Sequence, residues 1–201
     1  AGTLYVADYE NHMVRKVTSA GVVTTLAGGP DVSGNSDGQG TAARFMALQG
    51  IALDGAGNIY VTESGNRDVR KITASGLVTT LASGSGKFGE PRGIAVDSSG
   101  NLFVGDYSAN VIRKVTSEGI VSNHAGTAPT AGSNDGTLSS ALFYGPSGLA
   151  IDTAGNLYVA DTLNNTVRKI SPSGAVTTLA GTAGRTSSVD GSATSARFED
   201  P

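Results

Sequence analysis

The sequence predicts an all-β fold built from repeated four-stranded antiparallel sheets, and three observations carry this prediction. Glycine is frequent, with 29 of 201 residues, and together with many threonines and valines it is typical of short strands joined by tight turns. A segment of similar sequence occurs four times along the chain. No window shows the sustained 3.6-residue period of an amphipathic helix, which excludes a helical repeat.

The four copies are marked by an aromatic residue that precedes a valine, at Tyr5, Tyr60, Phe103 and Tyr158. The spacings are 55, 43 and 55 residues, close to the roughly 40 to 50 residues of one four-stranded propeller blade. We therefore expect residues 1–201 to form one β-propeller region, with blades at approximately 1–48, 49–91, 92–146 and 147–201.

Each copy divides into four short strands of the types GIAVD, NLYVAD, VRKV and VTTLA. The first two strands are linked by Asp-x-x-Gly-Asn, as in Asp97 to Asn101, where Gly100 and Asn101 are expected to supply the positive φ of a tight hairpin. The last two strands are linked by Ser/Thr-x-x-Gly, as in Ser171 to Gly174. The first two strands are apolar on both faces, which suits sheets packed face to face around an axis.

The pattern G-[IL]-A-x-D-x-x-G-N-[IL]-[YF]-V-x-[DE], followed by Asn and [VI]-R-K, resembles the NHL repeat over essentially the whole chain. The TLAG and DG…AxFxxP segments are similar to repeats of bacterial secreted proteins and teneurin-like ectodomains. The resemblance implies a propeller of about six blades, within the roughly four to eight of the architecture. The first copy lacks the innermost strand, which in the fourth copy is residues 147–153. We expect an arc of a larger propeller, or one completed by association through open strand edges.

Two copies depart from the pattern. The third has Ala109 where the others have asparagine, at Asn11, Asn66 and Asn164. The linker that follows the second copy lacks the Asp-Gly insertion that the other linkers carry at Asp37-Gly38, Asp135-Gly136 and Asp190-Gly191.

An acidic residue stands seven positions before the arginine of each Arg-Lys pair. Recurrence in every copy favours structural ion pairs between blades over a ring of ligand-binding charges, because a binding site rarely needs identical parts in each repeat. The predicted pairs are Asp8 with Arg15, Glu63 with Arg70, Asp106 with Arg113, and Asp161 with Arg168. A phenylalanine recurs three positions before the end of each copy and predicts a plug between neighbouring blades, at Phe45, Phe88, Phe143 and Phe198.

No catalytic residue, metal site or cofactor is predicted. The chain has no cysteine and two histidines, His12 and His124, fewer than the three or so protein ligands of a catalytic zinc. The aspartates at Asp54, Asp97 and Asp152 and in the Asp-Gly insertions leave calcium as an alternative, although the EF-hand spacing is absent and turn formation explains them more simply. No nucleophile elbow or phosphate loop occurs.

The short turns between the first two and the last two strands of a blade should lie at one end, and the variable loops and the linkers at the other. Variable loops on a rigid scaffold are where binding residues concentrate. Aromatic and arginine side chains are frequent anchors of interfaces. The candidate binding residues are Tyr9, His12, Arg67, Phe88, Arg92, Tyr107, Tyr144 and Leu163.

The function predicted first is therefore a non-catalytic binding or assembly scaffold for a protein or glycan partner. The alternatives are a lyase or hydrolase of propeller fold with active residues outside this sequence, such as the zinc-dependent peptidylglycine amidating lyase that NHL propellers resemble, and a structural subunit of a surface assembly. A net charge of −3 argues against nucleic acid, and no apolar run reaches the length of a membrane span. The richness in Thr, Ser and Gly and the family resemblance favour a secreted or cell-surface bacterial protein.

Overall fold

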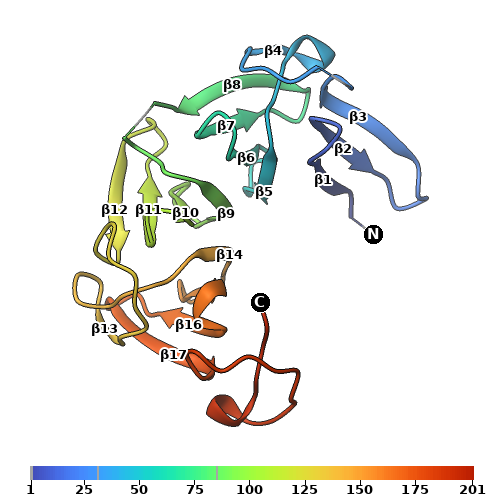
Figure 1. Cartoon of the computed structure of the whole chain (residues 1–201). Coiled ribbons are helices and arrows are strands. Elements are labelled where there is room, and N and C mark those ends of the chain that lie inside the picture. The colour runs from blue at the N-terminus through green and yellow to red at the C-terminus, as the bar shows by residue number, and fades with distance from the viewer. Residues whose placement is uncertain (1, 31, 85) are drawn as a thin grey trace. The chain divides into compact units, whose positions relative to one another are not determined.

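The computed structural model describes residues 2–30, 32–84 and 86–201, and the all-β prediction is confirmed. The chain divides into two compact units, Ala1–Pro91 and Arg92–Pro201, called unit 1 and unit 2 below. Each unit contains two antiparallel sheets and the linker between them (Figure 1).

Unit 1 begins with a three-stranded sheet in the order β1-β2-β3. Its second sheet has five strands in the order β4-β8-β7-β6-β5, because the short β4 of the linker pairs with the edge strand β8. The bounds are β1 Leu4–Asp8, β2 Met13–Val17, β3 Val23–Gly28, β4 Gly38–Gln39, η1 Gly40–Ala42, β5 Leu48–Leu53, β6 Ile59–Glu63, β7 Asp68–Ile72 and β8 Leu77–Ala82.

Unit 2 repeats this plan with a four-stranded sheet, β12-β11-β10-β9, and a five-stranded sheet, β13-β17-β16-β15-β14. The bounds are β9 Pro91–Val96, β10 Leu102–Asp106, β11 Val111–Val115, β12 Val121–Ala125, β13 Gly136–Thr137, β14 Pro146–Ile151, β15 Leu157–Asp161, η2 Thr162–Asn164, β16 Thr166–Ile170, β17 Ala175–Gly181 and η3 Ala193–Ser195. Uniformly four-stranded sheets were expected, so the fifth strands are a correction. A two-residue strand carries too little alternation to be recognised from sequence.

The short turns form as the Asp-x-x-Gly-Asn pattern requires, with one correction. Gly100 takes a φ of +82°, whereas Asn101 does not adopt a positive φ. Asn101 instead donates from its side chain to Asp97 Oδ2 at 2.8 Å, and its main-chain N–H donates to Asp97 Oδ1 at 2.8 Å. The aspartate thus holds the turn closed from inside, which explains its recurrence without a bound ion.

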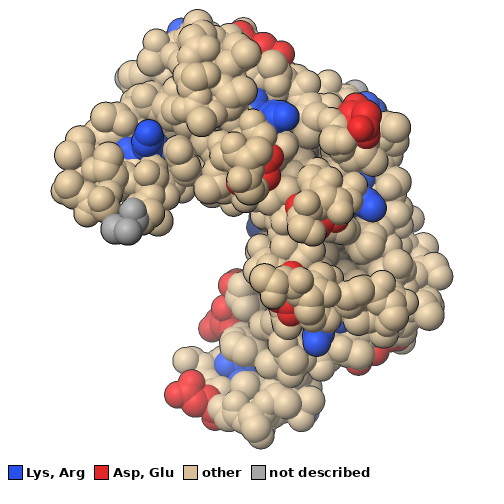
Figure 2. Space-filling model, turned by 180° about the vertical axis from the view of Figure 1, so that it is seen from behind, with Lys and Arg blue, Asp and Glu red and all other residues tan. Residues whose placement is uncertain are grey.

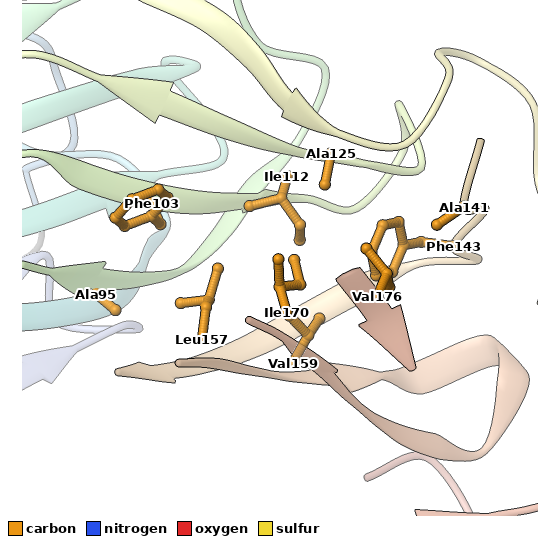
Figure 3. Close-up of a cluster of buried hydrophobic side chains, with 10 residues drawn as sticks. All are labelled: Ala95, Phe103, Ile112, Ala125, Ala141, Phe143, Leu157, Val159, Ile170 and Val176. Atoms are coloured by element: carbon orange, nitrogen blue, oxygen red, sulfur yellow. The ribbon is translucent and has the colours of Figure 1, made fainter. Parts of the chain in front are cut away.

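The hydrophobic core of each unit lies between its two sheets. In unit 2, Phe103 and Ile112 of one sheet face Leu157 and Ile170 of the other, and Phe143 from the linker completes the cluster, as Figure 3 shows. In unit 1, Phe45 takes the same position between the two sheets. Phe45 and Phe143 are fully buried. Within each unit, the recurrent phenylalanine therefore fills the space between adjacent sheets.

The long linkers do not stay at the end where the sequence placed them. In unit 1, the Gly40 N–H donates to Gly76 O at 2.8 Å, and the Gln39 side chain donates to Ser75 O at 2.6 Å. These partners belong to the short turn between β7 and β8. The prediction that all linker residues lie on the side of the variable loops is therefore wrong, because the fifth strand draws the linker along the sheet edge to the opposite end.

Candidate functional site

The acid-arginine pairs lie within sheets. Asp161 ends β15, and Arg168 lies on the adjacent β16, where the hairpin register brings the two side chains together. The expectation that these pairs connect neighbouring blades is therefore wrong, because antiparallel pairing already places both groups on one face of one sheet. The nitrogen-oxygen distances are 3.8 Å for Arg15 and Asp8, 2.7 Å for Arg70 and Glu63, 3.2 Å for Arg113 and Asp106, and 2.8 Å for Arg168 and Asp161.

In the second and fourth sheets, the preceding linker adds a second carboxylate to the arginine. Asp37 Oδ1 lies 2.7 Å from Arg70 Nη2, and Asp135 Oδ1 lies 2.8 Å from Arg168 Nη2. Both arginine side chains are fully buried. The Asp-Gly insertion therefore does more than form a turn, because its carboxylate accepts a charge-assisted hydrogen bond from Nη2 of a buried guanidinium.

Burial raises the pKa of the Asp161 carboxyl above its ordinary value, although Asn164 and Arg168 donate hydrogen bonds that oppose this rise. The Asn164 side chain donates both to Asp161 Oδ2 and to Gly132 O of the linker, each at 2.7 Å. This explains the repeated asparagine of the loop pattern. The acid, arginine and asparagine bind the linker to the sheet and are surrounded by protein, so they are poorly placed to meet a ligand.

Two of the predicted binding residues, His12 and Arg67, have a left-handed backbone conformation in their loops. His12 has a φ of 54° and Arg67 a φ of 60°, the same turn position that Asn110 and Asn165 occupy in unit 2. Tyr9 precedes His12 in its loop and is 45% exposed. In unit 1, the loops therefore expose Tyr9 and Arg67, while the role of His12 includes the shape of the turn.

Four predicted binding residues of unit 2 gather around Gly145. A Cβ added to Gly145 would lie 2.8 Å from Leu163 Cδ1 and 2.8 Å from Tyr107 Cε2. The Arg92 guanidinium lies 3.4 Å from the centroid of the Tyr107 ring. Tyr144, which is 44% exposed, is the residue before Gly145. We call Arg92, Tyr107, Tyr144 and Leu163 the Gly145 surface.

The Gly145 surface is held by main-chain hydrogen bonds. Leu163 N–H donates to Tyr144 O at 3.0 Å, and Tyr144 N–H donates to the buried Asp161 at 2.7 Å. Gly145 N–H donates to Asn110 Oδ1 at 3.0 Å. Sequence reasoning missed Asn110 and Gly145. The sequence signal that could have indicated Gly145 is a glycine two positions after Phe143, where the first copy has Ala47 two positions after Phe45.

Phe88 does not belong to a surface that a partner could reach, because its side chain is 2% exposed. The prediction that Phe88 binds a partner is therefore wrong, and its burial fits the prediction that the recurrent phenylalanines fill the interior. A phenylalanine in a linker cannot be assigned to the surface or the core without the path of the linker.

No group of three His, Asp or Glu side chains that could hold a metal occurs among the described residues. His12 lies in a loop of unit 1, whereas His124 lies on β12 of unit 2 with its ring 4.8 Å from that of Phe103. Burial lowers the pKa of His124, and Lys114 lowers it further. Figure 2 shows acidic and basic residues interspersed on the face it presents, without a large patch of one sign. No described helix is long and apolar enough to cross a membrane.

Comparison with known proteins identifies one repeat and the fold. Over 175 residues the chain is 29% identical to the Arabidopsis thaliana protein SUPPRESSOR OF QUENCHING 1, chloroplastic, a match that covers 83% of this chain and 12% of that protein. An auxiliary nutrient binding protein from Bacteroides ovatus matches 99% of this chain and 60% of its own, with a TM-score of 0.69 and 19% identity. Virginiamycin B lyase from Staphylococcus aureus, solved with quinupristin, matches 88% of this chain and 51% of its own, with a TM-score of 0.64 and 19% identity. Residues 143–170 match the family model of the NHL repeat, so the chain carries an NHL repeat and the resemblance that its sequence predicts is confirmed.

Proposed function

We propose that the chain is a non-catalytic binding scaffold and that the Gly145 surface contacts a protein partner. The observation that carries this proposal is the convergence of four predicted binding residues from separate parts of the sequence. Arg92 lies on β9, Tyr107 in the β10-β11 loop and Leu163 in the β15-β16 connection. Tyr144 lies in the linker before β14.

The residue types suit a protein interface. Tyrosine and arginine are enriched among the residues that contribute most to binding. Tyrosine offers a large amphipathic area at a low cost in conformational entropy, and arginine offers a planar guanidinium that stacks on aromatic rings and donates several hydrogen bonds. Here the Tyr107 ring is stacked against Arg92, and the Tyr144 main chain is bonded to Leu163 and Asp161. A surface ordered before binding avoids part of the entropic cost of association.

The comparisons include proteins of similar fold with different roles. One solved protein of similar fold is described as an auxiliary nutrient binding protein, and another is a lyase, so the fold alone does not separate binding from catalysis. We further propose a secreted or cell-surface location, which fits the composition of the chain.

The test is a screen of the purified chain against the secreted and surface proteins of its source organism and against a glycan array. Each hit is then purified, and its affinity is measured for wild-type protein, Tyr144→Ala and Arg92→Ala. We expect each variant to weaken binding at least about tenfold, as truncation of an interface anchor does. Tyr158→Phe is the matched control, because the Tyr158 hydroxyl bonds Asp152 in a short turn, and it should change affinity less than about twofold.

A protein partner that binds wild type and both variants equally would overturn the role of the Gly145 surface. Hits restricted to the glycan array would replace the protein by a carbohydrate. A turnover of substrate by the intact protein would favour the lyase or hydrolase alternative. A concentration-dependent assembly in analytical ultracentrifugation, without any hit, would favour a structural subunit.

A further inference from the structure

The arginine of the third sheet differs from its counterparts in the second and fourth sheets. Arg70 and Arg168 have side chains with no exposed area, whereas the Arg113 side chain is 17% exposed. Among the residues that the structure describes, Arg113 forms one hydrogen bond, from Nε to Asp106 Oδ2 at 3.2 Å. Its two terminal nitrogens are thus left without the linker carboxylate that the other two arginines bind.

The cause lies in the linker. The linker that precedes the third sheet lacks the Asp-Gly insertion, so this sheet gains neither an aspartate nor a fifth strand. β12 is therefore the edge strand of the third sheet, while β8 and β17 are each covered by a short linker strand (Figure 1).

A surface pocket of about 450 Å³ lies at this edge, entirely within unit 2. Arg113, Asn123 and His124 of the sheet and Thr127, Leu138 and Ser139 of the following linker contribute to its lining, and no acidic residue does. The volume falls in the range of roughly 300 to 1,000 Å³ that is usual for small-molecule sites. The pocket is thus open, is lined by both polar and apolar groups, and is supplied with one cation.

The second and fourth sheets show which chemical group such an arginine binds. Asp37 accepts hydrogen bonds from Arg70 and, at 2.9 Å, from the hydroxyl of Thr80, which lies opposite Arg70 in the strand register. Asp135 accepts in the same way from Arg168 and, at 3.0 Å, from Thr178.

The residue opposite Arg113 in the register is Asn123, and both line the pocket. The third sheet therefore has the arginine and, opposite it, a polar side chain, but it lacks the linker carboxylate that binds the arginine in the second and fourth sheets.

We propose that this pocket binds a sugar acid, with the ligand carboxylate on Arg113 and the ligand hydroxyls on the polar side chains of Asn123, Thr127 and Ser139. Carboxylate is the match for the planar guanidinium fork. The Asn123 amide donates to Gly126 O at 2.7 Å and the Thr127 hydroxyl donates to Ser139 O at 3.1 Å. Their oxygens and the second amide hydrogen of Asn123 are left to accept from and donate to the hydroxyls of a sugar. Burial lowers the pKa of His124, so its ring is neutral at neutral pH and can share in this hydrogen bonding.

This inference does not depend on the Gly145 surface. The probes are galacturonate, its neutral counterpart galactose, and inorganic phosphate, each titrated into the intact chain while amide and arginine side-chain resonances are followed by NMR. We expect galacturonate to bind with a dissociation constant of roughly millimolar order, as suits a small ligand in an open pocket, and to shift the Arg113 and Asn123 signals. Galactose and phosphate should bind at least about tenfold more weakly.

The diagnostic variant is Asn123→Asp, which places a carboxylate on the strand opposite Arg113 and leaves the Asp106 contact in place. This carboxylate would compete with the ligand for the arginine, as the linker aspartates bind Arg70 and Arg168. It should weaken galacturonate binding at least about tenfold. Ser122→Asp, one position away on β12 and outside the pocket lining, and Tyr144→Ala should leave it unchanged within about twofold. Equal binding of galactose, or of phosphate, would overturn the ligand class. Binding unaffected by Asn123→Asp, or no shift at Arg113, would overturn the site.

Discussion

Replacing Gly145 by alanine should both destabilise unit 2 and disturb the Gly145 surface. Gly145 has a φ of +63°, and an added Cβ would lie 2.8 Å from atoms of both Leu163 and Tyr107. The left-handed backbone costs about 1–2 kcal/mol for a residue with a Cβ, and moving the two side chains from their rotamers adds about 0.5–1.5 kcal/mol. We therefore expect a loss of about 2–3 kcal/mol in the free energy of unfolding.

The assay is urea denaturation followed by circular dichroism. With a slope of about 2 kcal/mol per molar, this loss lowers the midpoint by about 1 M. Unit 1 provides the matched control, because Ala47 stands at the equivalent turn with a φ of +55°. Ala47→Gly relieves backbone strain in the folded state but raises the conformational entropy of the unfolded chain. Because these two effects oppose each other, the urea midpoint of this variant should move by less than about 0.5 M.

The contact with Leu163 can be tested separately, because the second sheet has Gly65 at the position of Leu163. In a Leu163→Gly background, the Gly145→Ala penalty should fall by about 1 kcal/mol. A Gly145→Ala protein as stable as wild type would refute the assignment of this turn. An unchanged penalty in the Leu163→Gly background would refute the steric contribution of Leu163 and leave backbone strain and the contact with Tyr107 as the cause.

Three further predictions concern the linkers, the core and the turns. Asp135→Asn should cost about 1 kcal/mol, since a half-exposed carboxylate is partly screened, whereas Asp190→Asn, whose side chain bonds no described residue, should change the unfolding free energy by less than about 0.5 kcal/mol; equal effects would contradict this. Phe143→Ala should cost about 3–5 kcal/mol and the more exposed Phe198→Ala about 1 kcal/mol, measured by urea denaturation. Hydrogen bonds hold the pKa of Asp152 below its ordinary value, so it stabilises the fold above about pH 4 and this contribution is lost as pH falls through the lowered pKa. Asp152→Asn should therefore melt lower at neutral pH but converge with wild type in acid, and a constant difference would contradict the assignment.

The strands and their ion pairs could be predicted because they depend on local spacing. An acid seven positions before an arginine, across a four-residue loop, necessarily meets it when the two strands pair, as Asp161 and Arg168 do. Once the register of strand pairing is known, the spacing of two residues in the sequence therefore predicts whether their side chains are in contact. The same reasoning does not reveal Asp135 as a partner of Arg168, because the two are 33 positions apart and are joined by the course of a linker.

The sequence predicted the four residues of the Gly145 surface, but it did not predict Gly145 and Asn110, which bring them together. Tyr107 and Tyr144 stand out as aromatic residues in variable segments, but their gathering depends on the linker turning back at Gly145 and on the Asn110 side chain that receives it. Neither the turn at Gly145 nor the position of Asn110 follows from a periodic pattern in the sequence. Glycine and asparagine at irregular turns carry information about backbone conformation that becomes specific only with the tertiary path in view.

A residue that recurs in every copy of a repeat is commonly assigned a structural role, but the recurrent arginines of this chain differ in their surroundings. Arg70 and Arg168 are structural because a linker aspartate closes each of them. Arg113 keeps its acidic partner Asp106 but lacks that aspartate, and the residue opposite it is Asn123 where the other two sheets have a threonine. The linker thus decides whether an aspartate binds the guanidinium or the guanidinium lines a pocket, so an arginine that recurs in every copy can have different surroundings from one copy to the next. In this chain, then, a departure in the linker and a departure on the edge strand β12 coincide at the pocket that we propose as a ligand site.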